Sequence, residues 1–213
     1  MTNYNMVKQN LFDFKNDDKQ LKIIARKIPK NSEIFFNKVY KCLNSVSGFV
    51  KYDNSKQDIQ KFLDKIITKD IKCDPFYRVW IDDMSNLCKL FCKFIGDNKI
   101  SFWVGTERGC KRYHVDMVPF RLLVTYAGQG TELLPDYAAN RSAFRDGKSN
   151  KEILKSKSAL EYINKWDIAI FRGGEDSILH RTPDSALESK SSILMRLDNP
   201  SLLDVIKNNN QVA

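Results

Sequence analysis

Residues 111–128 read KRYHVDMVPFRLLVTYAG and contain one of the two histidines of the chain. Val, Phe, Leu, Thr and Tyr are frequent in this stretch, and β-branched and aromatic side chains are typical of strands. We predict strands at 111–118 and 120–128. Side chains two residues apart on a strand point to the same face, so His114 and Asp116 would lie together on one side of a sheet.

Similar short runs fill the second half of the chain. Gly, Pro, Asn and Asp separate them, and many short strands with turn residues between them predict an antiparallel sandwich or barrel. The further predicted strands are 99–107, 167–173, 177–183 and 191–198, with one helical insert at 151–166 and a frayed end at 207–213.

The first half shows helical periodicity instead. A helix is expected over 54–67, and Asp74-Pro75 begins a longer one that Gly96 ends, since glycine is common just beyond a helix. Weaker helix candidates are 20–28 and 32–43. The sequence therefore predicts an α+β fold, in which a helical N-terminal region (1–98) packs on a double-stranded β-helix, a cupin-like jelly-roll barrel (99–213), as one compact unit.

Composition is that of a soluble globular protein, with 42% hydrophobic and 29% charged residues. No segment approaches the roughly 20 apolar residues of a membrane helix. The first residues lack the features of a secretory signal, so a cytoplasmic location is expected. The five cysteines form no C-x-x-C pair and are odd in number, which argues against a disulfide framework and a zinc ribbon.

The formal charge is +9, and most of the excess is lysine scattered along the chain. Without a dense basic block or interleaved aromatic residues, specific nucleic-acid binding is disfavoured. It stays open as a third hypothesis, which predicts one contiguous basic face.

The second histidine, His180, lies in the run LHRTP (179–183). Together with His114 and Asp116 it can form a 2-His-1-carboxylate triad, which leaves metal positions open for other ligands and is typical of non-haem Fe(II) oxygenases. Two alternatives remain. The histidines can be ordinary core residues while Asp116 caps a turn or pairs with Arg121. Cys110 can be a further ligand for zinc, provided that the chain turns between residues 110 and 114.

A second pattern lies before His180. Residues 166–173 (WDIAIFRG) resemble the Gly-Asp-hydrophobic strand that precedes the distal histidine of cupin-like oxygenases, with Trp in place of Gly. In 2-oxoglutarate oxygenases an Arg or Lys follows that histidine and binds the cosubstrate carboxylate. Lys190 lies at the usual gap of about ten residues, but Arg196 is favoured because a guanidinium matches a carboxylate at two points.

The stretch CKRYHVDMVPFRLLVTYAGQGTELLPD (110–136), with HRTP (180–183) and LMRLD (194–198), resembles a bacterial family known as domain of unknown function 1826. The resemblance covers roughly residues 75–200. Members typically have Trp where Leu133 or Leu134 stands here, and Asp near Asn140. The family occurs beside zinc-responsive genes and metallochaperone GTPases, which implies a role in zinc handling.

Two main hypotheses follow. In the first, the protein is an Fe(II)- and 2-oxoglutarate-dependent oxygenase acting on an unidentified small molecule or protein, with Arg196 or Lys190 as cosubstrate anchor. In the second, it is a non-catalytic Zn²⁺-binding protein of metal homeostasis, with Cys110 as an added ligand. Candidate residues for an anionic substrate are Arg112, Arg121, Arg141 and Arg181. Glu132 and Asp136 either orient substrate or are solvated turn residues, the interpretation we favour.

Overall fold

A computed structural model describes residues 2–188 and 190–200. The helices are α1 (Tyr4–Lys15), α2 (Ser32–Val39), α3 (Ser55–Leu63), α4 (Lys69–Lys72), α5 (Pro75–Ile95), α6 (Arg141–Arg145) and α7 (Asn150–Ile153), with 3-10 turns η1 (Asp136–Ala138), η2 (Lys157–Ala159) and η3 (Asp184–Ala186). The strands are β1 (Leu21–Ile24), β2 (Ser45–Lys51), β3 (Lys99–Gly105), β4 (Phe120–Ala127), β5 (Glu132–Leu134), β6 (Glu161–Tyr162), β7 (Ile168–Arg172), β8 (Leu179–Arg181) and β9 (Ile193–Asp198).

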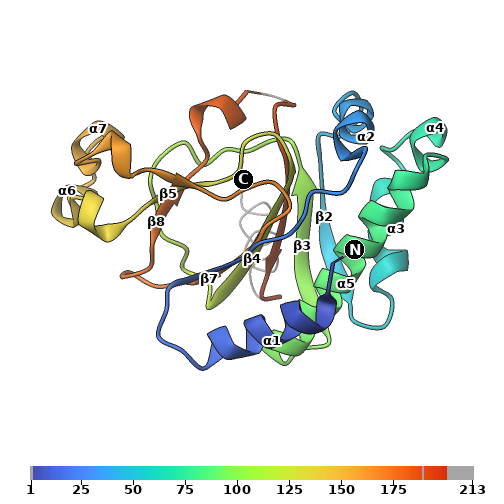
Figure 1. Cartoon of the computed structure of the whole chain (residues 1–213), viewed down its shortest axis with the longest axis horizontal. Helices are drawn as coiled ribbons and strands as arrows, with labels where there is room; N and C mark the ends of the chain where they lie inside the picture. The colour runs from blue at the N-terminus through green and yellow to red at the C-terminus, as the bar shows by residue number, and fades with distance from the viewer. Residues whose placement is uncertain (1, 189, 201–213) are drawn as a thin grey trace, which may run out of the picture.

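The strands form two antiparallel sheets, which makes the fold α+β, as the sequence predicts. The large sheet has the order β1-β7-β4-β9-β3-β2, and the small sheet has the order β6-β5-β8. Figure 1 shows α1, α3 and α5 on one side of the large sheet, with β5 and β8 on the other and α6 and α7 beyond them.

Each face of the large sheet packs a different core, because side chains alternate along a strand. Leu122, Ile170 and Leu197 belong to the core shared with the helices. Their neighbours on the opposite face, such as Leu123 and Phe171, pack with Leu133 of the small sheet. The second core lies between the two sheets and determines which residues can meet there.

The long helix α5 covers the first core and has the ends that the sequence predicts. The Asp74 side chain accepts a hydrogen bond from the backbone N–H of Phe76, and Gly96 ends the helix with φ of 77°. A left-handed residue at this position is nearly free of strain only for glycine. Trp80 is fully buried within the face that α5 turns to the sheet.

Several predicted elements were wrong. The weak helix at 20–28 is strand β1, which pairs with β7 and shows that tertiary pairing outweighs local propensity. Residues 45–51, which were not predicted as a strand, form β2 beside β3. The helical insert at 151–166 ends at Ile153 and continues as η2 and β6. The predicted frayed end at 207–213 lies outside the described residues.

The predicted strand at 111–118 is also absent as a regular element, and its one β-bridge joins His114 to His180. The chain enters β4 only at Phe120, after Pro119, which has no N–H to donate to a ladder. His114 and Asp116 therefore do not owe their positions to strand alternation.

Trp166, the first residue of the WDIAIFRG run, has φ of 70°. This left-handed conformation is costly for a bulky side chain. The ring is buried and packs 4.9 Å from Tyr126, centroid to centroid. Packing of this aromatic group offsets the conformational cost.

Candidate metal centre

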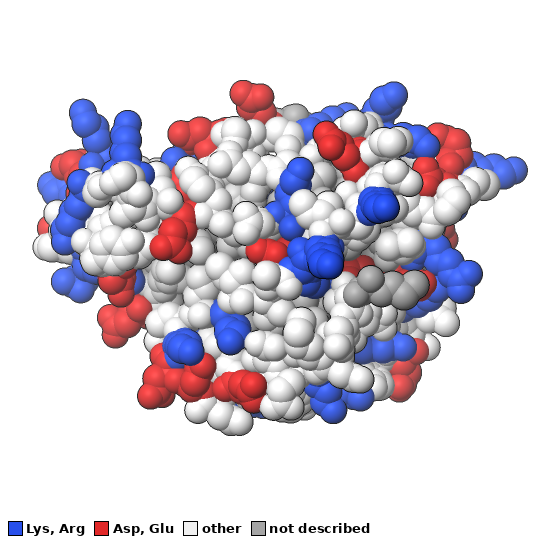
Figure 2. Space-filling model, in the orientation of Figure 1, with Lys and Arg blue, Asp and Glu red and all other residues white. Residues whose placement is uncertain are grey.

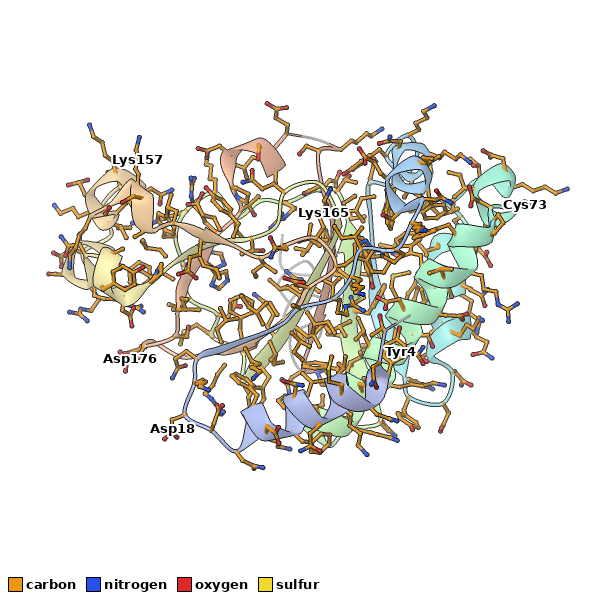
Figure 3. The ribbon with its side chains drawn as sticks, viewed as in Figure 1. Tyr4, Asp18, Cys73, Lys157, Lys165 and Asp176 are labelled. Carbon is orange, nitrogen blue, oxygen red and sulfur yellow. The ribbon has the colours of Figure 1, made fainter. Side chains whose placement is uncertain are left out.

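His114 and His180 are joined through their backbones. The N–H of each donates to the carbonyl of the other, at 3.0 and 3.1 Å. Their ring centroids lie 4.4 Å apart, and the His180 ring packs 4.8 Å from Phe171 of the large sheet. The site therefore lies between the two sheets, and in Figure 3 the labelled Asp176 marks the β7–β8 loop that leads to His180.

Asp116 is held beside the histidines by the same loop. The Gly174 N–H donates to the Asp116 carbonyl at 2.8 Å. Gly173 approaches so closely that a Cβ on it would lie 1.9 Å from the Val118 carbonyl oxygen. The Asp116 side chain is 3% exposed, and its Oδ1 accepts a hydrogen bond from Nη1 of Arg121.

The other carboxylate oxygen of Asp116, Oδ2, is buried and has no hydrogen-bond partner within the part of the chain that the structure describes. It lies 3.4 Å from His180 Nε2, and Oδ1 lies 4.0 Å from His114 Nε2. One donor atom from each of the three residues lies within 4.8 Å of the others. Buried polar atoms are normally satisfied, so this oxygen indicates a missing positive partner.

Both imidazoles are oriented by their Nδ1 atoms. His114 Nδ1 lies 3.0 Å from the Arg112 carbonyl, and His180 Nδ1 lies 3.1 Å from the Ile178 carbonyl. A carbonyl only accepts, so Nδ1 carries the proton and the neutral ring has its lone pair on Nε2. Metal-binding histidines are commonly fixed in this way.

Burial of His180 favours a metal ion over a proton at its Nε2. Burial lowers the pKa of His180 to about 4, so this ring is neutral near pH 7. The Nε2 lone pair of His180 then faces the carboxylate of Asp116 with no proton between them, and the His114 ring lies beside both. Nitrogen and oxygen donors of this kind suit divalent transition metals, so the residues fit a metal ion.

Cys110 lies next to His114 but is not part of the three-residue group found among the described residues. Burial disfavours the charged His114 ring, yet its contacts with the Cys110 thiol and the Arg112 carbonyl prevail and raise its pKa. The contact with His114 lowers the pKa of the Cys110 thiol. The thiol is therefore a neighbour of His114, one of the three candidate ligands.

Arg121 and Arg196 lie beside the triad on the face of the large sheet that meets the small sheet. Arg121 Nε donates to Asp198 Oδ1 at 2.7 Å. Arg196 Nε lies 3.0 Å from Asp198 Oδ2, and its guanidinium packs 5.8 Å from the Trp103 ring. Although burial disfavours the charge, Asp198 and Asp116 raise the pKa of Arg121. Sequence reasoning missed Asp198, because nothing in the order of residues indicates that it bridges two arginines.

The remaining candidates have protein partners. Lys190 is exposed, with Nζ 3.5 Å from the Lys41 carbonyl. Arg112 donates to the Lys148 carbonyl at 2.6 Å, and Arg141 donates to the Ser177 carbonyl at 2.7 Å.

Arg181 and Glu132 join strands β8 and β5 next to the site. Arg181 contacts both oxygens of Glu132, at 2.6 and 3.2 Å, and Tyr113 donates to the same carboxylate. Glu132 is 1% exposed, so the interpretation as a solvated turn residue was wrong. Asp136, by contrast, is an exposed partner of Arg141.

Charges on the surface are mixed. On the face shown in Figure 2, Lys and Arg side chains are interspersed with Asp and Glu. This face offers no support for a contiguous basic surface. No helix among the described residues has both the length and the apolar character needed to cross a membrane.

The family model "Protein of unknown function (DUF1826)" matches residues 7–198, and the chain belongs to this family. The Fe(II)/α-ketoglutarate-dependent dioxygenase TqaL is similar at a TM-score of 0.48 and 9% identity, over 92% of this chain and 88% of that one. A bsmA homologue from Methylobium petroleophilum PM1 is similar at a TM-score of 0.43 and 9% identity, over 93% and 94% of the two chains. A comparison with curated proteins gives no match.

Proposed function

We propose that the protein is an Fe(II)- and 2-oxoglutarate-dependent oxygenase, with His114, Asp116 and His180 as metal ligands. The observation that carries the proposal is the buried Oδ2 of Asp116, which has no hydrogen-bond partner within residues 2–188 and 190–200 and lies 3.4 Å from the Nε2 of a neutral His180. When bound, Fe(II) would supply oxygen activation coupled to oxidation of the cosubstrate. Three protein ligands leave room for that chemistry, whereas a structural zinc site is closed by four.

Arg196 is the proposed anchor for the cosubstrate carboxylate. It lies beside Asp198 and Arg121 on the interior face, and its side chain is 31% exposed. Asp116 and Asp198 balance Arg121 and Arg196, so a bound divalent cation leaves two positive charges in the site. A dicarboxylate such as 2-oxoglutarate would neutralise both.

The fold supports this assignment if the two facing sheets form a double-stranded β-helix, which we include in the proposal. Phe171, Leu133 and Leu194 pack between the sheets and limit access of water to the buried side of the site. The His114 side chain is 31% exposed, against 4% for His180. Substrate would therefore approach from the His114 side.

The proposal is tested by anaerobic purification, metal analysis and titration with Fe(II) and 2-oxoglutarate. We expect one metal per chain, 2-oxoglutarate binding that depends on the metal, and loss of both in His180→Ala. Absence of stoichiometric metal from the wild-type protein would overturn the proposal. Metal binding without any 2-oxoglutarate binding would reject the oxygenase and retain a metal site.

The second candidate is a non-catalytic zinc protein, and the proximity of Cys110 to His114 favours it. Substitution with Co²⁺ separates the two candidates, because thiolate ligation gives a strong charge-transfer absorption that nitrogen and oxygen ligands lack. The oxygenase predicts no such band and unchanged metal affinity in Cys110→Ser. A band that Cys110→Ser removes would establish the four-ligand zinc site.

A further inference from the structure

Four charged side chains of alternating sign form a continuous line between the two sheets. Asp116 contacts Arg121, Arg121 Nε donates to Asp198 Oδ1 at 2.7 Å, and Arg196 Nε lies 3.0 Å from Asp198 Oδ2. We call these four residues the ion-pair chain. One end is a proposed metal ligand, and the other is the proposed cosubstrate anchor.

The register of the large sheet builds this line. Arg121 of β4 pairs with Asp198 of β9, and Leu123 pairs with Arg196. Alternation therefore places Arg121, Asp198 and Arg196 on the same face. Side-chain exposure is 3% for Asp116, 13% for Arg121, 2% for Asp198 and 31% for Arg196. Buried charges are screened weakly, so each pair affects the next.

We infer that the ion-pair chain couples metal binding at Asp116 to carboxylate binding at Arg196, with Arg121 and Asp198 as positioning residues. This inference rests on the proposed function. Asp116 has one carboxylate to share between Arg121 and a cation on Oδ2. A cation bound at Oδ2 takes part of the Asp116 charge, so Asp116 attracts Arg121 less strongly. Arg121 then interacts more strongly with Asp198.

The stronger Arg121–Asp198 interaction also affects Arg196, the proposed cosubstrate anchor. Asp198 then neutralises Arg196 less, so Arg196 binds an incoming carboxylate more tightly. Within residues 2–188 and 190–200, Arg196 approaches Asp198 through Nε as an ion pair without a hydrogen bond, which leaves the two terminal nitrogens for a ligand. Coupling between binding sites is reciprocal, so a carboxylate at Arg196 also tightens the metal.

The experiment measures the affinity of 2-oxoglutarate by calorimetry, with and without Mn²⁺ as a redox-stable metal. In the wild type, metal raises this affinity through direct contact with the ligand and through the ion-pair chain. In Asp198→Asn the direct part remains, and we expect the metal-dependent increase to fall by about tenfold. The affinity without metal should rise, because Arg196 has lost its competing carboxylate.

A rise in the metal-free affinity distinguishes loss of the ion-pair chain from structural damage. Structural damage would weaken 2-oxoglutarate binding both with and without metal. Asp184→Asn is the matched control, since it removes an equal charge from an exposed residue. Arg121→Lys keeps the charge but cannot bridge two carboxylates as a guanidinium does, and it should also reduce the metal effect. It provides a second test if Asp198→Asn does not fold.

The outcomes separate the two proposals. If the wild type binds neither metal nor 2-oxoglutarate, both the proposed function and the coupling are wrong. If the wild type binds both and the metal effect is the same in Asp198→Asn and Arg121→Lys, the oxygenase proposal stands and the coupling is rejected.

Discussion

His114 and His180 exchange two backbone hydrogen bonds, at 3.0 and 3.1 Å, across an isolated bridge. Among the described residues, no regular strand extends this pairing on the His114 side. The separation of the two rings therefore depends on contacts made by the adjacent residues, Tyr113 and Arg181. Both contact Glu132 of β5.

Replacement of Glu132 by Gln should destabilise the protein by about 3 kcal/mol, because Arg181 would keep a largely buried charge without its main partner. Urea unfolding measures this change. Asp184→Asn removes the other, 80% exposed carboxylate of Arg181 and should cost less than about 1 kcal/mol. Equal effects of the two substitutions would show that Glu132 does not hold the strands together.

Gly173→Ala should weaken metal binding. The added Cβ would meet the Val118 and Asp116 carbonyl oxygens at 1.9 and 2.6 Å, so the segment that carries Asp116, a proposed metal ligand, must move. Changes behind metal ligands typically cost about 10–100-fold in affinity. Gly109→Ala is the control, since no atom of the residues that the structure describes lies within 4 Å of its added Cβ. Metal titration of both variants makes the comparison, and unchanged affinity in Gly173→Ala contradicts the assignment of Asp116.

Metal removal should lower the melting temperature. A metal at about one hundred times its dissociation constant stabilises the folded state by about 2.7 kcal/mol, provided that the unfolded chain does not bind it. Differential scanning calorimetry with and without a chelator should show this loss in the wild type. His114→Ala should melt at the same temperature in both conditions, and a persisting difference would place the metal elsewhere.

Asp74 gives a stability effect that depends on pH. The Lys38 ammonium and the Phe76 N–H hold its pKa below the ordinary value of 3.8. A carboxyl with a lowered pKa stabilises the folded state above pH 3.8, and this contribution is lost as pH falls through the folded-state pKa.

Asp74→Asn keeps a side-chain cap for α5 but removes the charge, whereas Asp74→Ala removes both. The alanine variant should lose about 1 kcal/mol at pH 7. Urea unfolding between pH 2.5 and pH 7 should show the wild type and Asp74→Asn converging at the acidic end. A constant difference over this range would mean that the carboxylate charge contributes nothing.

The parts of the fold that the sequence predicts are those with strong local signals. Asp74-Pro75 and Gly96 fix the ends of α5 through capping and a left-handed residue, and both act within one turn of the helix. Strand β1 has no such signal. Leu21–Ile24 becomes a strand because β7 offers an edge to pair with, and that information lies about 145 residues further along the chain.

The candidate site also depends on contacts between residues that are far apart in the sequence. Sequence spacing suggested that His114 and Asp116 share a strand face, but the structure brings them together through the bridge to His180 and the close approach of Gly173. The choice of residue types was informative, since only two histidines were available. The role of Asp198 depends on strand register, which local sequence does not specify.

The central claim is that one cation is held by Nε2 of His114, Nε2 of His180 and Oδ2 of Asp116. A crystal structure of the protein with Mn²⁺, with data collected for anomalous scattering, tests it most directly. We predict a single strong peak about 2.1 Å from these three atoms, with both Nδ1 atoms still bonded to carbonyls. No peak there, or a metal bound through Nδ1 or through Cys110, would contradict the account.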